Sequence, residues 1–365
     1  MSGPAAPSSA PRRSLEETAR VFEEASRALF RHAPLYRALS AGAARDPFLL
    51  GLAAGSRPGQ SPALMLLAAV HDLLLRGVSH PLAAVYADLA VGRPPAEDPF
   101  PLFRDFCAEH EEAIRPLVET RSVQTNEVGR SVYIRLGLEW LGLCRGAQPV
   151  SLVEIGASAG LNLCWDLYAM QLVLPDGELW AGDPAAPVRL RCEVRQGTIP
   201  RQRGAQAPEI VERLGLELDP PDLESPDEVR WLTALLWADH PERIDRFRAA
   251  VELARCAPWP VLRADVCRDL ARCCAGLRND TLLCVVHTYL VTQLTPELRR
   301  GLEEQLSRLS QEREVIQIGA EQPQGDTRLA AAIWRGGRME REATLATGDP
   351  HARWISWLAG GGNAG

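Results

Sequence analysis

The most informative part of this sequence is the stretch Val153-Glu154-Ile155-Gly156-Ala157-Ser158-Ala159-Gly160-Leu161-Asn162. A short apolar run begins at Val150, carries an acid at Glu154 and ends at Gly156. Small residues then form a tight turn, and a helix is expected directly afterwards, over 161–171. Because glycine permits positive φ and lets a ligand approach the backbone closely, the pattern predicts a strand, a ligand-binding turn and a helix N-terminus.

Short apolar runs of the same kind recur along the chain after residue 150 and alternate with helical segments. The expected strands are 150–155, 188–194, 214–218, 260–263, 282–286 and 315–319, and the expected helices are 227–238, 242–255, 267–276 and 296–309. A hairpin follows around Gly336-Gly337, over 329–346, and a last short element covers 349–358. This alternation predicts an α/β domain with a mostly parallel sheet and helices on both faces.

Before residue 150 the apolar residues recur at helical intervals instead. Ser14 and Glu17 have capping-box spacing, and Pro62 begins a helix that Gly77 ends. Further helices are expected over 81–89, 99–119 and 125–144, with a Gly/Pro-rich stretch over 91–99. We therefore expect a disordered tail over 1–13, an α-helical N-terminal cap domain over 14–146, a Rossmann-like domain over 147–358 and a flexible tail over 359–365.

The composition excludes several kinds of site. The chain has 365 residues, and all 40 of its basic residues are arginine. The absence of lysine excludes a P-loop lysine and a pyridoxal Schiff base. A net charge of −7 argues against nucleic acid as the main partner, since phosphate binding favours a basic surface.

The cysteines and the apolar runs indicate where the protein resides. The nine cysteines are scattered and form no CxxC pair, which favours the reduced cytoplasm and predicts no metal site. The most apolar run, 62–75, contains His71 and Asp72 and is too short to span a bilayer. We expect a cytoplasmic protein that binds a small molecule and no membrane; its oligomeric state is left open.

The charge beside the turn points to a class of ligand. A carboxylate just before the turn repels a pyrophosphate but can receive an ammonium group. This favours S-adenosylmethionine (SAM), whose amino-acid tail carries an ammonium, over NAD or FAD. The alternative is a Gly/Ala-rich turn that only packs a helix against a strand.

At this point the sequence resembles known families. Glu154-x-Gly156-x-Ser158-x-Gly160 resembles motif I of the class I SAM-dependent methyltransferases, with serine replacing the middle glycine. The string GASAGLN (156–162) is similar to the bacterial DUF2332 family, as are QTNEVGR (124–130), GLELDP (215–220) with RWL (230–232), and His351-x-Arg353-Trp354. The resemblance runs from about residue 14 to 358. It implies a Rossmann-like class I methyltransferase fold with a helical N-terminal cap, in which 147–358 binds SAM.

The resemblance leaves three functions open. Azetidine-2-carboxylate synthases, SAM enzymes of this architecture, cyclise SAM to azetidine-2-carboxylate and methylthioadenosine for secondary metabolism. We expect this reaction, because the chain combines a DUF2332-like cap and motif I with no recognisable acceptor-binding module. The alternatives are a methyltransferase that acts on a small-molecule acceptor and a non-catalytic SAM-binding protein. The motifs quoted do not separate the synthases from the wider family.

The residues expected to bind SAM include those of the turn and two acids that follow other strands. The turn residues are Glu154, Gly156, Ser158, Gly160 and Asn162. Glu217, with Asp219 as a substitute, is expected to accept hydrogen bonds from the ribose hydroxyls, unless it is a solvated acid. Asp265 is expected to contact the adenine amino group, to cap a helix, or both.

Two further groups are expected near the ligand. His287-Thr288-Tyr289 follow a buried strand, and the carboxyl ends of parallel strands line ligand-binding crevices. Tyr289 can hydrogen-bond the amino-acid tail or present its ring to the sulfonium, and His287 can take a proton or simply satisfy a core hydrogen bond.

Asn126, Glu127 and Arg130 are expected on one face of a helix. Arg130 can bind a carboxylate, and Asn126 or Glu127 can hold an ammonium; the alternative is a surface ion pair. The candidate catalytic residues are Tyr289, His287, Asn126 and Tyr168, the last within the helix expected after the turn.

Overall fold

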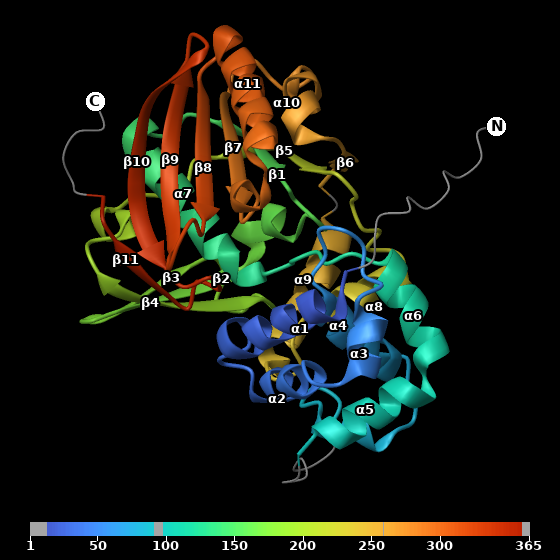
Figure 1. The fold of residues 1–365 in the computed structure, drawn as a ribbon. Helices are drawn as coiled ribbons and strands as arrows, with labels where there is room; N and C mark the ends of the chain where they lie inside the picture. The colour runs from blue at the N-terminus through green and yellow to red at the C-terminus, as the bar shows by residue number, and fades with distance from the viewer. Residues whose placement is uncertain (1–12, 91–97, 258, 360–365) are drawn as a thin grey trace. The chain divides into compact units, whose positions relative to one another are not determined.

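The computed structural model describes residues 13–90, 98–257 and 259–359 (Figure 1). Contacts divide the chain into two compact units, each made of two segments. The helical unit is Met1–Thr125 with Ser225–Asp245, and the sheet unit is Asn126–Glu224 with Arg246–Gly365. The tails expected over 1–13 and 359–365 lie almost entirely outside the described residues, as does most of the Gly/Pro-rich stretch 91–99.

Short helices with well-defined caps build the helical unit. They are α1 (Leu15–Glu24), α2 (Pro34–Ala43), α3 (Pro47–Ala53), α4 (Pro62–Leu75), α5 (Phe100–Glu109), α6 (Glu111–Thr120) and α8 (Pro226–Ala234), with a π-helical turn at Ala25–Leu29 and a 3₁₀ turn at Pro81–Val85. The expected capping box is confirmed, because Glu17 N donates to Ser14 Oγ at 3.1 Å and Ser14 N donates to Glu17 Oε2 at 2.9 Å.

The core of the helical unit surrounds α4, which is buried on almost every side. Its two polar side chains are both satisfied. Asp72 accepts hydrogen bonds from Arg76 at 2.8 Å and from Arg230 of α8 at 3.0 Å. His71 pairs with Asp88 at 3.0 Å. These buried partners explain how a central helix carries polar groups, since unpaired ones would be costly to bury.

The observed units differ from the expected boundary at 146/147. Helix α7 (Ser131–Arg145) belongs to the sheet unit, where a Cβ on Gly137 would lie 2.6 Å from Ile318 of the sheet. The helix therefore packs closely on a strand at a position that has no side chain. Residues 225–245 join the helical unit instead, because α8 packs on α4 through contacts such as that of Arg230 with Asp72. Helical periodicity alone could not show which core each helix covers.

One eleven-stranded sheet forms the centre of the sheet unit. Its strands are β1 (Val150–Ile155), β2 (Ala169–Leu174), β3 (Gly177–Ala181), β4 (Arg189–Gln196), β5 (Ile210–Glu217), β6 (Val261–Arg263), β7 (Leu282–Thr288), β8 (Val315–Glu321), β9 (Thr327–Arg335), β10 (Arg338–Gly348) and β11 (Trp354–Trp357). Their order is β3-β2-β4-β11-β10-β9-β8-β7-β1-β5-β6. The five strands from β6 to β8 run parallel, and β9 and β10 form the expected antiparallel hairpin. The expected α/β class with a mostly parallel sheet is confirmed.

Helices cover the two faces of the parallel part of the sheet (Figure 1). Val153, Ile155 and Val285 point to one face, where they share a core with α10 (Val266–Cys274) and α11 (Pro296–Glu312). Alternate residues point to the other face, where Ile318 meets α7. Helix α9 (Pro241–Cys256) lies in the connection between β5 and β6.

The prediction of a helix over 161–171 is wrong, because the helical part is a short 3₁₀ helix that ends at Leu167. Leu161–Leu167 form a short 3₁₀ helix, η4, and Ala169–Leu174 form strand β2. The backbone of β2 pairs with β3 and with β4, and the residues that follow Gly160 thus extend the sheet. Strand β3, which the sequence also did not predict, pairs with β2. Pairing with distant strands overrides local helical periodicity here.

Two other expected helices are also divided differently. Residues 81–89 contain only the 3₁₀ turn Pro81–Val85, and 99–119 is split at His110 into α5 and α6.

Truncating a side chain in the centre of the sheet should destabilise the protein strongly. Leu283 of β7 is fully buried between neighbouring strands and the α10–α11 layer. Leu283→Ala should lower the free energy of unfolding by about 2–5 kcal/mol, measured by urea denaturation. Leu298→Ala, on the exposed side of α11, is the matched control and should cost less than about 1 kcal/mol. Equal losses for the two variants would contradict this core.

Candidate functional site

The glycine turn lies where the strand order of the sheet reverses. Within the parallel part of the sheet, β5 and β6 lie on one side of β1, and the chain then crosses to β7 and β8 on the other side. In open α/β sheets, ligands bind at such a point, outside the carboxyl ends of the strands. The ends of β1 and β7 meet there, since a Cβ on Gly156 would lie 3.1 Å from Leu290.

The turn itself has a backbone that only certain residues adopt easily. Gly156 and Gly160 have φ values of 68° and 71°, and Ser158 has a φ of 48°. The amides of Gly156 and Ala157 both donate to the carbonyl of Leu216 in β5, at 2.8 and 3.2 Å. A left-handed conformation at a non-glycine residue is uncommon and is held here by the surrounding hydrogen bonds.

Glu217, at the end of β5, lies against this turn. Its carboxylate accepts a hydrogen bond from the amide of Ser158 at 2.7 Å and another from the amide of Leu218 at 2.7 Å. The structure therefore brings together the turn and the acid that the sequence assigned to the ribose. Asp219, the substitute, pairs instead with Arg263 at 2.6 Å.

Glu154 is a buried acid on the side of the turn that faces α7. It is 1% exposed, and its Oε2 atom has no hydrogen-bond partner among the described residues. Burial raises the pKa of Glu154 to about 8, an effect that the hydrogen bond from Asn162 opposes and the charge of Glu217 reinforces.

A chain of two hydrogen bonds orients Glu154. Asn162 Nδ2 donates to Glu154 Oε1 at 3.2 Å, and Ser131 Oγ donates to Asn162 Oδ1 at 2.8 Å. The amide of Asn162 thus bridges the hydroxyl of Ser131 and the acid. Sequence reasoning missed Ser131; its only signal was its place beside the QTNEVGR string.

Asn126 connects the segment before α7 to the turn. Its Nδ2 donates to Ser158 Oγ at 3.0 Å, and its Oδ1 accepts from the amide of Ala159 at 3.3 Å. Asn126 is not on a helix, however. It precedes the 3₁₀ turn Val128–Arg130, so Asn126, Glu127 and Arg130 do not share a helical face as expected. They lie on the segment before α7, which contacts the turn through Asn126 and Tyr289 through Arg130.

The same segment reaches the end of β7 through Arg130. The guanidinium carbon of Arg130 lies 3.7 Å from the ring centroid of Tyr289, which has a φ of 57°. The hydroxyl of Tyr289 bonds to Thr327, and burial raises its pKa. Arg130 is 6% exposed and also donates to the carbonyl of Pro350 at 3.3 Å. A buried cation therefore lies beside Tyr289, on the ring expected to meet a sulfonium.

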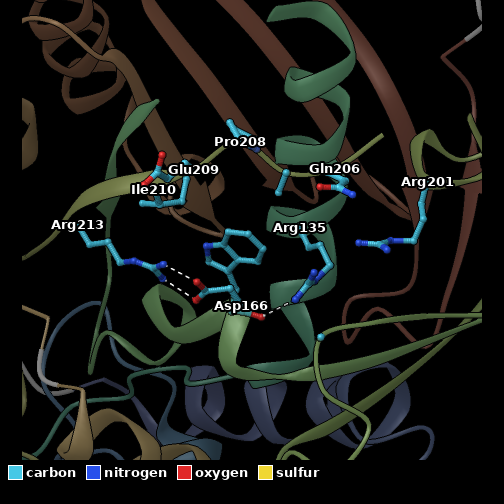
Figure 2. A pocket seen from close by; sticks show the side chains of 11 residues that line it. Arg135, Asp166, Arg201, Gln206, Pro208, Glu209, Ile210 and Arg213 are labelled. Atoms are coloured by element: carbon cyan, nitrogen blue, oxygen red, sulfur yellow. Dashed lines mark hydrogen bonds and ion pairs between the residues drawn. The ribbon is translucent and has the colours of Figure 1, made fainter. Parts of the chain in front are cut away.

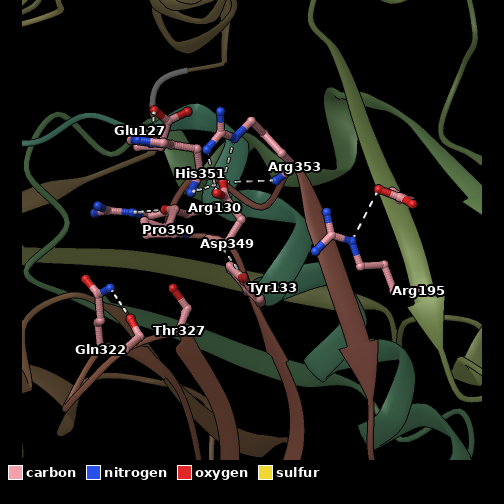
Figure 3. A network of polar contacts seen from close by, with 12 residues as sticks. Glu127, Arg130, Tyr133, Arg195, Gln322, Thr327, Asp349, Pro350, His351 and Arg353 are labelled. Carbon is pink, nitrogen blue, oxygen red and sulfur yellow. Dashed lines mark hydrogen bonds and ion pairs between the residues drawn. The ribbon is translucent and has the colours of Figure 1, made fainter. Parts of the chain in front are cut away.

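The β10–β11 loop holds this segment in place (Figure 3). Glu127 Oε2 pairs with His351 Nδ1 at 2.9 Å, and Tyr133 donates to the carbonyl of Asp349 at 2.7 Å. Burial opposes ionisation of Asp349, but hydrogen bonds from Arg353 outweigh it and lower the pKa. Two strings that resemble one family, QTNEVGR and the one around His351, are thus in direct contact, about 220 residues apart in sequence. The structural role of Asp349 was not anticipated.

His287 does not share the site of Glu154, and that expectation is corrected. Glu154 pairs with Val286 in the β1–β7 register, so the next side chain along β7 points to the opposite face. There His287 bonds to Glu321 at 2.7 Å and to Gln317 at 3.0 Å. Burial raises the pKa of Glu321, but the hydrogen bond from His287 and backbone amides hold it at about 2. The alternative reading, a histidine satisfied within the fold, fits this placement.

Tyr168 and Asp265 also use their polar groups within the fold. The hydroxyl of Tyr168 donates to the carbonyl of Leu161 at 2.5 Å, and its side chain is fully buried. Asp265 caps α10 through the amide of Cys267 at 3.0 Å, and its other oxygen lies 3.4 Å from Arg268. The helix-cap reading of Asp265 is therefore confirmed, while its contact with adenine stays a prediction.

A cavity of about 220 Å³ borders the turn at Ala159 and Gly160 and is lined by Trp259 and Arg255 among others. Its lining includes neither Glu154 nor Glu217, so we do not assign it to the ligand.

Among the residues that the structure describes, one cluster could hold a metal ion, although the sequence spacing predicted none. His80, Asp105 and Glu109 of the helical unit place ligand atoms within 4.8 Å of one another. Both acids are exposed, and such groups are common without an ion.

The fold and its glycine turn define the class of protein. This is an α/β protein with a large, mostly parallel sheet whose glycine turn lies where the strand order reverses. The chain belongs to the DUF2332 family, described as an uncharacterized protein conserved in bacteria, which it matches over residues 19–357. No curated protein and no solved structure matches it. Within the described residues, no helix is long and apolar enough to cross a membrane.

The raised pKa of Glu154 should make stability depend on pH. The folded protein holds this proton more tightly than the unfolded chain, so the resulting stabilisation is complete below about pH 4.5 and lost as the pH rises to about 8. Relative to Glu154→Gln, the native protein should lose on the order of 1.4 kcal/mol per pH unit across that interval.

The measurement is urea denaturation of both proteins from pH 5 to pH 8.5. Glu303→Gln, an exposed substitution on α11, is the control and should run parallel to the native protein. A constant difference between the native protein and Glu154→Gln would show that Glu154 is not protonated in the fold.

Proposed function

We propose that the turn from Glu154 to Asn162 binds SAM and that the protein closes the amino-acid tail of SAM into azetidine-2-carboxylate, releasing methylthioadenosine. The observation that carries this proposal is a buried acid of raised pKa, Glu154, directly before a glycine turn at the reversal of strand order. The proposed fold of the sheet unit is accordingly the Rossmann-like class I methyltransferase fold, with the helical unit as its cap.

The charges around the turn support a cationic nucleoside. Two acids, Glu154 and Glu217, flank the turn, and Glu217 already occupies the amide of Ser158. A phosphate would meet the carboxylate of Glu217 there and would lose that amide donor. A ribose needs only acceptor oxygens, which Glu217 supplies, and the unpartnered Oε2 of Glu154 can accept a hydrogen bond from an amine.

The opposite charge lies at the end of β7. Arg130 is held between the ring of Tyr289 and the carbonyl of Pro350. A guanidinium binds a carboxylate with two parallel hydrogen bonds, and burial strengthens them. In this proposal Arg130 binds the SAM carboxylate, and Asn126, which spans from this segment to Ser158, orients the tail between the two ends.

The proposed reaction needs the α-amine in its neutral form. The ammonium first loses one proton, and the nitrogen lone pair then attacks the γ-carbon. The bond between that carbon and sulfur breaks, and its electron pair stays on sulfur, which leaves as neutral methylthioadenosine. Positioning of the tail supplies most of the acceleration, because the nucleophile and the electrophile belong to one molecule.

Glu154 is the group best suited to take that proton. Its pKa of about 8 lies close to the 7.7–8.0 of an ordinary α-amine, so the proton can move from nitrogen to the carboxylate at little cost. An acid of ordinary pKa would instead hold the amine as an ammonium, which is not a nucleophile. His287 lies on the other face of the sheet and Tyr168 is bonded to Leu161, so neither takes part.

Incubation with SAM as the only substrate tests the reaction. Mass spectrometry should detect methylthioadenosine and azetidine-2-carboxylate in equal amounts, and the rate should rise with pH toward about 8 as Glu154 ionises. Glu154→Gln should slow turnover by about 10²–10⁴-fold, because it removes the proton acceptor, and should still bind SAM. Glu303→Gln should retain native turnover.

Other products would identify the alternative functions. S-adenosylhomocysteine formed only with an added acceptor would indicate a methyltransferase. Binding of SAM with no product under any condition would indicate a non-catalytic SAM-binding protein. Either outcome would end the cyclisation proposal while leaving the binding site in place.

A bulky substitution at a glycine of the turn tests the binding site itself. Gly156→Val should abolish SAM binding in calorimetry, because Gly156 has a φ of 68° and its Cβ would lie 3.1 Å from Leu290. Gly325→Val carries the same backbone penalty at a φ of 66° in open space, so it should bind SAM normally. Retained binding by Gly156→Val would place SAM elsewhere.

A further inference from the structure

A second polar cavity lies in the sheet unit, apart from the glycine turn. It has a volume of about 470 Å³ and lies between α7, η4, the 3₁₀ turn Pro200–Arg203 and the start of β5. Three arginines line it: Arg135, Arg201 and Arg213. Figure 2 shows Arg213 and Arg201 extending toward Arg135 from opposite sides.

Two of these arginines already have carboxylate partners. Arg213 binds Asp166 through two hydrogen bonds, of 2.7 and 2.5 Å. Arg201 donates from both Nε and Nη2 to a single oxygen of Glu139, Oε1, at 3.0 and 2.8 Å, and the buried Oε2 of Glu139 has no hydrogen-bond partner among the described residues. Burial raises the pKa of Glu139, and the charge of Arg201 opposes that rise. These two pairs are therefore neutral overall.

Arg135 has no carboxylate hydrogen-bonded to it among the described residues. It is 5% exposed, and two long hydrogen bonds run from its Nη2 to the carbonyls of Trp165 and Tyr168, at 3.4 and 3.5 Å. Its Nε atom is buried without a partner, and its guanidinium carbon lies 4.9 Å from the Trp165 ring centroid. Burial lowers the pKa of Arg135, yet an arginine stays charged in a protein.

Two neighbouring donors are also unsatisfied. The indole Nε1 of Trp165 and the Nε of Arg213 are buried without hydrogen-bond partners in the described part of the chain. Buried donors are normally paired, so three in one wall require an explanation. The remaining charge in the lining is Glu209, which is exposed. The charges of Glu139 and Asp166 also stabilise the Arg135 cation, but three guanidiniums face only these two carboxylates along the inner wall.

We propose that this cavity is a second ligand site, which binds the carboxylate of a small organic acid at Arg135. A single carboxylate matches the single unpaired guanidinium in charge and in planar geometry. The indole N–H of Trp165 is a second donor for the same group. This site shares no lining residue with the glycine turn, so it is independent of the reaction proposed there.

Calorimetric titration of the whole protein with acetate tests the proposal, with sodium chloride at matched ionic strength as the reference and inorganic phosphate as a competing anion. Acetate should bind at one site per chain and more tightly than phosphate. Arg135→Met should weaken acetate binding about tenfold or more, because it removes the charge and keeps the side-chain length. Arg300→Met, an exposed arginine on α11, makes the same change in net charge and should bind like the native protein.

A conservative pair keeps the test informative if Arg135→Met does not fold. Trp165→Phe keeps the ring and removes the donor, so it should weaken acetate binding by a smaller factor, about two- to fivefold. Arg135→Lys keeps the charge without the planar fork, so it should bind acetate more weakly than the native protein. Acetate that binds no better than chloride, or equally to the native protein and to whichever of these variants folds, would overturn the proposal.

Discussion

The packing of the sheet unit around its glycine turn depends on one buried arrangement of acids. Glu154 is buried just before the turn, where its Oε2 has no hydrogen-bond partner among the described residues, and Glu217 accepts a hydrogen bond from the amide of Ser158. The left-handed backbone of Ser158 and the chain Ser131–Asn162–Glu154 both follow from these two contacts. The contacts that shape the turn therefore also hold Glu154, the acid whose pKa burial raises.

Segments from distant parts of the chain complete this arrangement. The loop before α7 contributes Asn126 to the turn and Arg130 to the ring of Tyr289, while the β10–β11 loop holds Glu127 through His351. Each contact is polar and mostly buried, and each would be costly to leave half-formed. This explains why the strings that carry the family resemblance are so far apart in sequence and yet meet in one place.

The arginine-only composition shapes both sites. Arg130 and Arg135 are each buried beside an aromatic ring, where a planar guanidinium stacks and a lysine ammonium would not. Arg130 has polar partners in the surrounding loops, whereas Arg135 has only long contacts to carbonyls. Arg130 is therefore fixed by polar groups of the fold, whereas the buried Nε of Arg135 has no hydrogen-bond partner among the described residues.

Local signals such as strand length, glycine and capping residues were enough to predict several features of the structure. These are the α/β class, the glycine turn, the C-terminal hairpin and the acids of the turn. It also placed Glu217, since an acid at the end of a strand must lie at the edge where strands end.

Three further features depend on contacts between distant residues and became clear only from the folded structure. Strand β2 forms because β3 and β4 pair with it, His287 faces away because of the register between β1 and β7, and α7 belongs to the sheet because Gly137 packs on Ile318. Pairing, register and close packing are relations between distant residues, and no local pattern contains them.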